Sequence, residues 1–90
     1  MIEQATALPA HIQQLVDVGV KGIDIMHGQL KLDMLEAEEQ YKESQAVEDE
    51  SGNAMDSMER KYNEGFLDAL VYCYRLTYDI SFATAIKENN

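Results

Sequence analysis

The carboxylates of this sequence are concentrated in one segment. Clustered carboxylates could hold a metal ion, exchange protons or attract a cationic partner. Residues 33–59 contain ten of them and one lysine, a net charge of −9, while the 90-residue chain totals −10. Glu36, Glu39 and Glu43 would share one face of a helix, within about 15 Å along its axis. The negative charge is therefore gathered on one surface.

Metal binding requires spacings that this sequence lacks. There is no Asp-x-Asp-x-Asp-Gly loop for calcium, and the nearest match to the Glu-x-x-His pairs of a di-iron bundle is the single Asp24–His27 tetrapeptide. His11 and His27 are 16 residues apart and Cys73 is the only cysteine, so zinc spacing is absent as well. We expect no metal and no cofactor, with both histidines at the surface or at helix ends.

Catalytic motifs are also missing, because no glycine-rich phosphate loop and no Gly-x-Ser-x-Gly occurs. Cys73 lies in an apolar stretch without a base, which predicts a small buried hydrophobic residue. Arg75 and Asp79 have the spacing of an ion pair, which could also set the register between helices. The sequence does not predict an enzyme.

The acidic run has two interpretations, a solvated helix face or a surface that docks on a basic protein. In the second, the carboxylates would imitate the phosphates of DNA, although more sparsely. The partner-binding residues would be Asp33, Glu36, Glu38, Glu39, Glu43, Glu48, Asp49 and Glu50. Direct contact with nucleic acid is not expected, because a chain at −10 would repel phosphates.

The composition, with 46% hydrophobic residues, is that of one folded domain. A compact chain of this size would bury roughly 60–65% of its unfolded surface. A single cysteine gives no intrachain disulfide, and the start of the chain lacks a secretory signal, so we expect a cytoplasmic protein. The apolar stretch 66–86 contains Asp68, Arg75 and Asp79, which argues against a membrane span.

Residues 54–87 are predicted to form one long helix, beginning after Ser51-Gly52-Asn53 with Asn53 as its cap. Two apolar stripes follow this helix, about 100° apart, and imply two packing partners. One consists of Tyr62, Phe66, Ala69, Cys73, Leu76, Ile80 and Ala83, and the other of Leu67, Val71, Tyr74, Tyr78, Phe82 and Ala85. We expect a homo-oligomer, most simply a dimer, whose contacts include Tyr62, Phe66, Cys73, Tyr74, Leu76, Tyr78, Ile80 and Phe82.

Residues 29–50 are rich in helix formers, and Leu30, Met34, Ala37 and Tyr41 line one face. The short break at 50–53 would make the two helices antiparallel neighbours. Residues 1–28 show either helical spacing or the alternation of a β-hairpin near 16–26, and a break near Gly28 is expected. The predicted fold is all-α, an antiparallel helical hairpin or small bundle.

The segment from Arg60 to Leu70, RKYNEGFLDAL, and its continuation from Leu76 to Phe82, LTYDISF, resemble short accessory proteins of bacteriophages. The resemblance covers about a quarter of the chain. It implies a protein that binds a host protein and redirects or inhibits it, and it transfers no functional residue.

Two functions remain open at this point. The first is a non-catalytic inhibitor or regulator that occludes a basic, nucleic-acid-binding surface of a partner protein. The second is a structural helical homo-oligomer or adaptor whose carboxylates only keep it in solution.

Overall fold

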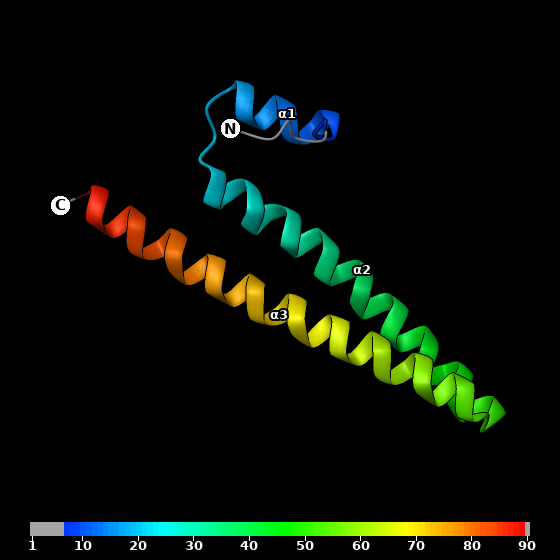
Figure 1. Cartoon of the computed structure of the whole chain (residues 1–90). Coiled ribbons are helices and arrows are strands. Elements are labelled where there is room, and N and C mark those ends of the chain that lie inside the picture. The colour runs from blue at the N-terminus through cyan, green and yellow to red at the C-terminus, as the bar shows by residue number, and fades with distance from the viewer. Residues whose placement is uncertain (1–6, 90) are drawn as a thin grey trace, which may run out of the picture.

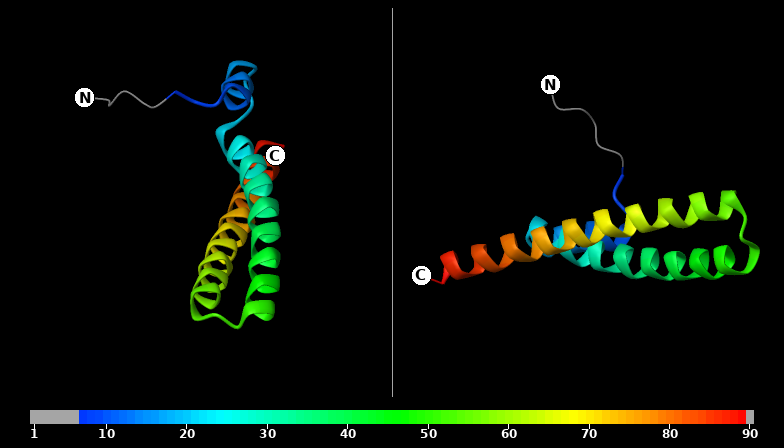
Figure 2. Two further views of the ribbon diagram at one scale, coloured as in Figure 1. Left: turned by 90° about the vertical axis from the view of Figure 1, so that its right-hand side faces the viewer. Right: turned by 90° about the horizontal axis from the view of Figure 1, so that it is seen from below.

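The computed structural model describes residues 7–89, which form three helices and no strand. α1 spans Ala10–Asp17, α2 spans Gly22–Ser51 and α3 spans Ala54–Glu88. α2 and α3 run antiparallel side by side, and α1 lies beside the first turns of α2 (Figure 1, Figure 2). The prediction of an all-α fold built on a helical hairpin is confirmed. No helix in the described range is long and apolar enough to cross a membrane.

The turn of the hairpin uses the residues expected from the sequence. Gly52 follows α2 with φ +63°, a left-handed conformation that glycine adopts without steric strain. The Asn53 side chain then accepts a 2.8 Å hydrogen bond from the backbone N–H of Met55. Asp56 lies in the first turn of α3, where its charge favours the positive end of the helix. The predicted cap at Asn53 is confirmed.

The contact between α2 and α3 follows a repeat of four and three residues on both helices. On α2 the inward positions, all buried or half-buried, are Ile23, His27, Leu30, Met34, Ala37, Tyr41, Ser44 and Glu48. On α3 they are Arg60, Asn63, Leu67, Leu70, Tyr74, Thr77, Ser81 and Thr84. This spacing keeps one face of each helix against its neighbour over many turns. The face predicted from Leu30 to Tyr41 is confirmed as the inner face of α2.

The seam between the helices contains little apolar core. Within residues 7–89, Ala37 is the one apolar residue that is fully buried, at 3% exposure, and the other buried residues are Ser44 and Thr77. The chain exposes 7231 Å², whereas a compact protein of 10.2 kDa exposes roughly 5,300 Å². It therefore removes only about half of its unfolded surface from water, less than the 60–65% expected.

The N-terminal part is helical, as one of the two sequence interpretations predicted, but its break lies elsewhere. The helix breaks at residues 18–21, where Gly19 has φ +88°, and Gly28 lies inside α2, so the prediction of a break near Gly28 is wrong. Residues 16–26 form no β-hairpin, because α2 already begins at Gly22. Lys21 pairs with Glu88 and the Ser81 hydroxyl donates to Asp24, which ties the start of α2 to the end of α3.

Candidate interaction surfaces

The acidic end of the hairpin, residues 33–59, is the first candidate surface. Of the eight residues predicted to contact a partner, five are exposed on α2, namely Glu36, Glu39, Glu43, Asp49 and Glu50. Asp33, Glu38 and Glu48 are half-buried beside the seam. α3 adds Asp56 and Glu59, which were not in the predicted set, because antiparallel packing brings its first turns beside the last turns of α2.

A groove between the helices brings acids from both together. Its volume is about 440 Å³, and it is lined by Gln40, Glu43, Ser44, Val47, Asp56, Glu59 and Asn63. Three of these side chains are carboxylates and none is basic. Glu43 comes from α2, whereas Asp56 and Glu59 come from α3. The groove can therefore receive a cationic side chain between carboxylates on two walls.

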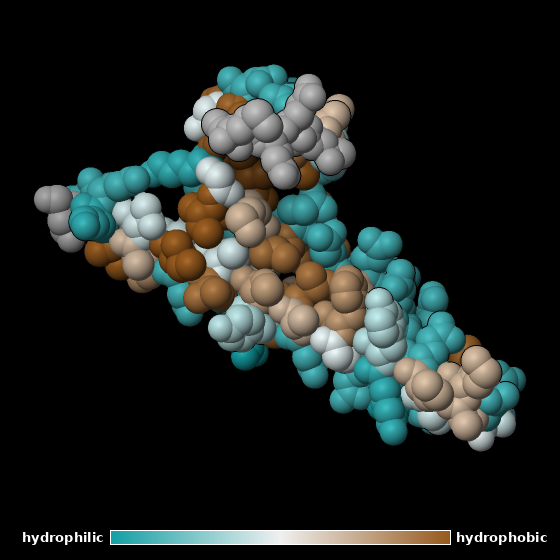
Figure 3. Space-filling model, in the orientation of Figure 1, coloured by the Kyte–Doolittle hydropathy of each residue, from teal (hydrophilic) through white to brown (hydrophobic). Residues whose placement is uncertain are grey.

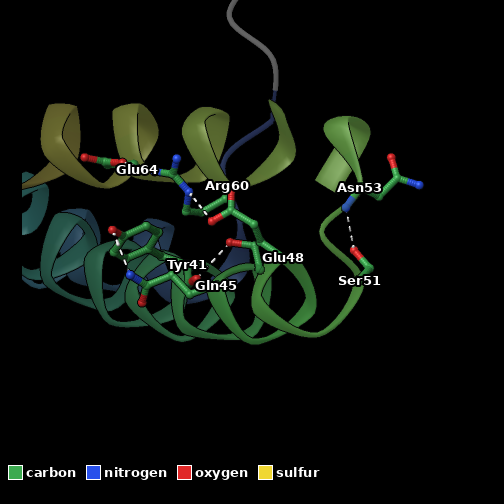
Figure 4. A network of polar contacts seen from close by, with 8 residues as sticks. Tyr41, Gln45, Glu48, Ser51, Asn53, Arg60 and Glu64 are labelled. Carbon is green, nitrogen blue, oxygen red and sulfur yellow. Dashed lines mark hydrogen bonds and ion pairs between the residues drawn. The ribbon is translucent and has the colours of Figure 1, made fainter. Parts of the chain in front are cut away.

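Arg60 neutralises part of the acidic end. Its Nε lies 2.9 Å from Glu48 Oε1 and its Nη1 lies 2.6 Å from Glu64 Oε2 (Figure 4). The Arg60 and Glu48 side chains are each 22% exposed. Hydrogen bonding by Ser57, and then by Arg60, lowers the pKa of Glu48 from its ordinary value of 4.5. Glu48, one of the predicted partner-binding residues, is thus already paired within the hairpin.

The second candidate surface is the apolar stripe that lies about 100° around α3 from the seam, called here the outer stripe. It consists of Tyr62, Phe66, Ala69, Cys73, Leu76, Ile80 and Ala83, every one of which is exposed. Tyr62 is 71% exposed, Phe66 47% and Ile80 44%. Cys73 lies in this stripe with an exposed thiol, so the prediction that it is buried is wrong for the single chain.

The other predicted stripe divides between the seam and the surface. Leu67 and Tyr74 face α2 and, like Val71, are half-buried, whereas Tyr78 and Phe82 are exposed, their rings stacked 6.3 Å apart. α2 therefore covers one stripe in part and leaves the outer stripe exposed, although Phe66 lines a pocket with Ala37 and Gln40 of α2. Figure 3 shows apolar side chains at the surface along the hairpin, with hydrophilic ones at its edges.

Sequence reasoning missed the role of His27, which was expected at the surface or at a helix end. Its ring stacks on Tyr74 at 4.4 Å between centroids, and its Nδ1 lies 3.0 Å from the Thr77 hydroxyl. That hydroxyl has backbone acceptors 3.0 Å away at Cys73 and Tyr74, to which it donates its single proton. Nδ1 of His27 is therefore the donor to Thr77. Extending the spacing of Leu30, Met34, Ala37 and Tyr41 upstream by three residues would have found this position.

Two smaller predictions can be compared with the geometry. In the described part of the chain, no group of three or more His, Cys, Asp or Glu side chains is arranged to hold a metal ion. Arg75 and Asp79 line a shallow depression with Tyr74 and Tyr78, and they form no ion pair among residues 7–89. The expected ion pair is therefore absent, and both charges are open to a partner.

Comparison with known proteins adds no assignment. No family model, curated protein or solved structure matches this chain.

Proposed function

We propose that this protein is a small, non-catalytic acidic binding protein whose hairpin end docks on a basic surface of another protein and keeps nucleic acid away from it. The observation that carries this proposal is the groove in which Glu43 of α2 meets Asp56 and Glu59 of α3. Exposed Glu36 and Glu39 extend the same negative surface along α2. Across 33–59, Lys42 is the only base, and it pairs with Glu38 at 3.1 Å.

Occlusion follows from charge and shape. An end that carries −9 attracts a basic patch over about one Debye length, roughly 8–10 Å at physiological salt, and speeds encounter. Once docked, the carboxylates occupy the lysines and arginines that would otherwise contact phosphates. Both binding and occlusion should weaken as salt rises. The resemblance of residues 60–82 to bacteriophage accessory proteins suggests a bacterial protein as the partner.

The test compares the wild type with two variants of equal charge change. Glu39→Lys with Glu43→Lys alters the acidic end, and Asp17→Lys with Asp68→Lys is the control, because those acids are exposed elsewhere. Each protein is immobilised and exposed to bacterial lysate, and bound proteins are eluted with salt or duplex DNA. We expect the wild type and the control to retain the same nucleic-acid-binding protein, released by both eluants, and the first variant to lose it. Equal capture by all three would contradict the proposal.

A second function is favoured by the outer stripe and not by the acids. The protein could be a structural homo-oligomer whose carboxylates only keep it in solution, since seven exposed positions on α3 form an apolar strip without a covering element in residues 7–89. Capture of nothing but further copies of itself would favour this function.

A further inference from the structure

The outer stripe is an apolar face of α3 whose seven positions are all exposed. Its exposed positions run from Tyr62 to Ala83, about 100° around α3 from the seam with α2. Beside it lie Tyr72, 68% exposed, and Ile86, 48% exposed. Apolar side chains repeated at intervals of four and three on an uncovered helix face form one half of a coiled-coil seam, without the second helix.

We propose that the outer stripe of α3 packs against the outer stripe of a second copy of this chain, with the two α3 helices antiparallel and centred between Tyr74 and Arg75. This inference does not depend on the function proposed for the acidic end. It rests on area, charge and the order of large and small side chains along the stripe.

The chain exposes more surface than a compact protein of its mass, and the excess is large enough for a dimer interface. The chain exposes 7231 Å², about 1,900 Å² more than a compact protein of its mass. If only half of this excess were buried on each of two chains, the interface would total about 1,900 Å², the size of a specific, stable protein–protein interface. With Ala37 alone as fully buried apolar core in residues 7–89, the hairpin has a weak internal source of stability. A second copy supplies the missing apolar burial.

Charge selects the antiparallel orientation. A parallel pair would place the two acidic ends side by side, each carrying −9 over residues 33–59. An antiparallel pair separates residue Met55 from its counterpart by about 58 Å along the axis, at 1.5 Å per residue. That separation is several Debye lengths, so the repulsion between the two ends is screened.

The sequence of side-chain sizes selects the register. With the proposed centre, Phe66 faces the partner's Ala83, Ala69 faces the partner's Ile80, and Cys73 faces the partner's Leu76. Each of these three layers combines one large and one small side chain, which fills the interface evenly, and Tyr62 at each end lies opposite the partner's Lys87. A shift of one heptad toward the N-terminus would place Phe66 against the partner's Leu76 and Ala69 against the partner's Cys73, giving small side chains at the centre and crowded layers on both sides of it.

The flanks of the interface agree with this register. On the side away from α2, Tyr72 lies opposite the partner's Asp79, so the phenol can donate a hydrogen bond to that carboxylate. This gives Asp79 a role that the absent ion pair with Arg75 does not provide. The overlap extends over 62–87 and leaves the acidic end of each chain free.

The orientation is tested by distances between nitroxide labels in the full chain. Cys73→Ala provides a cysteine-free background, and single labels are placed at Met55→Cys, on the exposed tip, or at Arg75→Cys, near the proposed centre. We expect a short distance between the labels at 75, below about 25 Å, and a distance of about 60 Å between the labels at 55. Short distances at both positions would indicate parallel helices and overturn the orientation. A monomeric mass in sedimentation, for the wild type and the labelled proteins, would overturn the dimer.

The register is tested by cross-linking in the same background. Ala69→Cys with Ile80→Cys should form a covalent dimer on oxidation, because these positions face each other twice in the pair. Phe66→Cys with Leu76→Cys is the matched control, since it would cross-link only in the register shifted by one heptad. Cross-linking of the control but not of the first pair would overturn the proposed register. Neither result involves the acidic end, so failure here is distinct from failure of the proposed function.

Discussion

His27 of α2 stacks on Tyr74 of α3, with ring centroids 4.4 Å apart and an angle of 23° between the ring planes. Tyr78 approaches the same imidazole at 5.8 Å. The imidazole also donates to Thr77, a residue only 6% exposed. This contact joins two helices near the open end of the hairpin, where apolar burial is sparse.

Replacing His27 with alanine should therefore destabilise the hairpin. The loss of an aromatic stack and of one hydrogen bond corresponds to about 1–2 kcal/mol in the free energy of unfolding. Thermal unfolding followed by circular dichroism measures the effect. His11→Ala is the matched control, because that imidazole is exposed and contacts only Gln29 at 3.1 Å among the described hydrogen bonds. If both variants melted at the same temperature, the stack would have no stabilising role.

The Arg60 network predicts a dependence on pH. Because the pKa of Glu48 is lowered below 4.5 in the folded chain by Ser57 and Arg60, its charge stabilises the fold fully above that value. The contribution is lost as pH falls through the folded-state pKa, since the unfolded state then binds the proton more readily. Glu48→Gln should have a lower melting temperature than the wild type at pH 7, and this difference in melting temperature should become smaller below about pH 4.5.

The control for this prediction is Glu39→Gln, which removes an exposed carboxylate from the same acidic end. It should not lower the melting temperature at pH 7, because it relieves repulsion without breaking an ion pair. A difference between Glu48→Gln and the wild type that stays constant from pH 7 to pH 3 would show that Glu48 acts through packing and not through its charge.

The long helices and the turn could be predicted from the sequence because their signals are local. Helix formers, the spacing of Leu30, Met34, Ala37 and Tyr41, and the cap at Asn53 each act within a few residues. The predicted position of the first helix break was wrong because the segment contains three glycines, and a glycine can either remain in a helix or end it. Gly19 adopts positive φ whereas Gly28 stays helical, and the residue type alone does not distinguish the two positions.

The interaction surfaces were predictable only in part. Charge counts identified the acidic run, but pairing across the turn decides which acids remain open, so the engagement of Glu48 by Arg60 was not foreseen. The two apolar stripes of α3 could be recognised in the sequence, but no local sequence feature indicates which of them α2 covers. Polar residues on the inner face, such as His27, Ser44 and Thr77, weakened the hydrophobic signal that would have decided it.

The same substitution at two glycines should have opposite effects on stability. Gly65 lies in the middle of α3 with helical geometry, and an added Cβ would meet no atom within 4 Å, so Gly65→Ala should raise the free energy of unfolding by about 0.5–1 kcal/mol. Gly52 has φ +63°, where an L side chain is strained, so Gly52→Ala should lower it by about 1 kcal/mol. Urea unfolding of both variants measures the two shifts.

If Gly65→Ala were also destabilising, a neighbour absent from the single chain would have to occupy the space beside Gly65. In the antiparallel pair that neighbour would be the partner's Ile86, and dilution below the dissociation constant should then restore the gain.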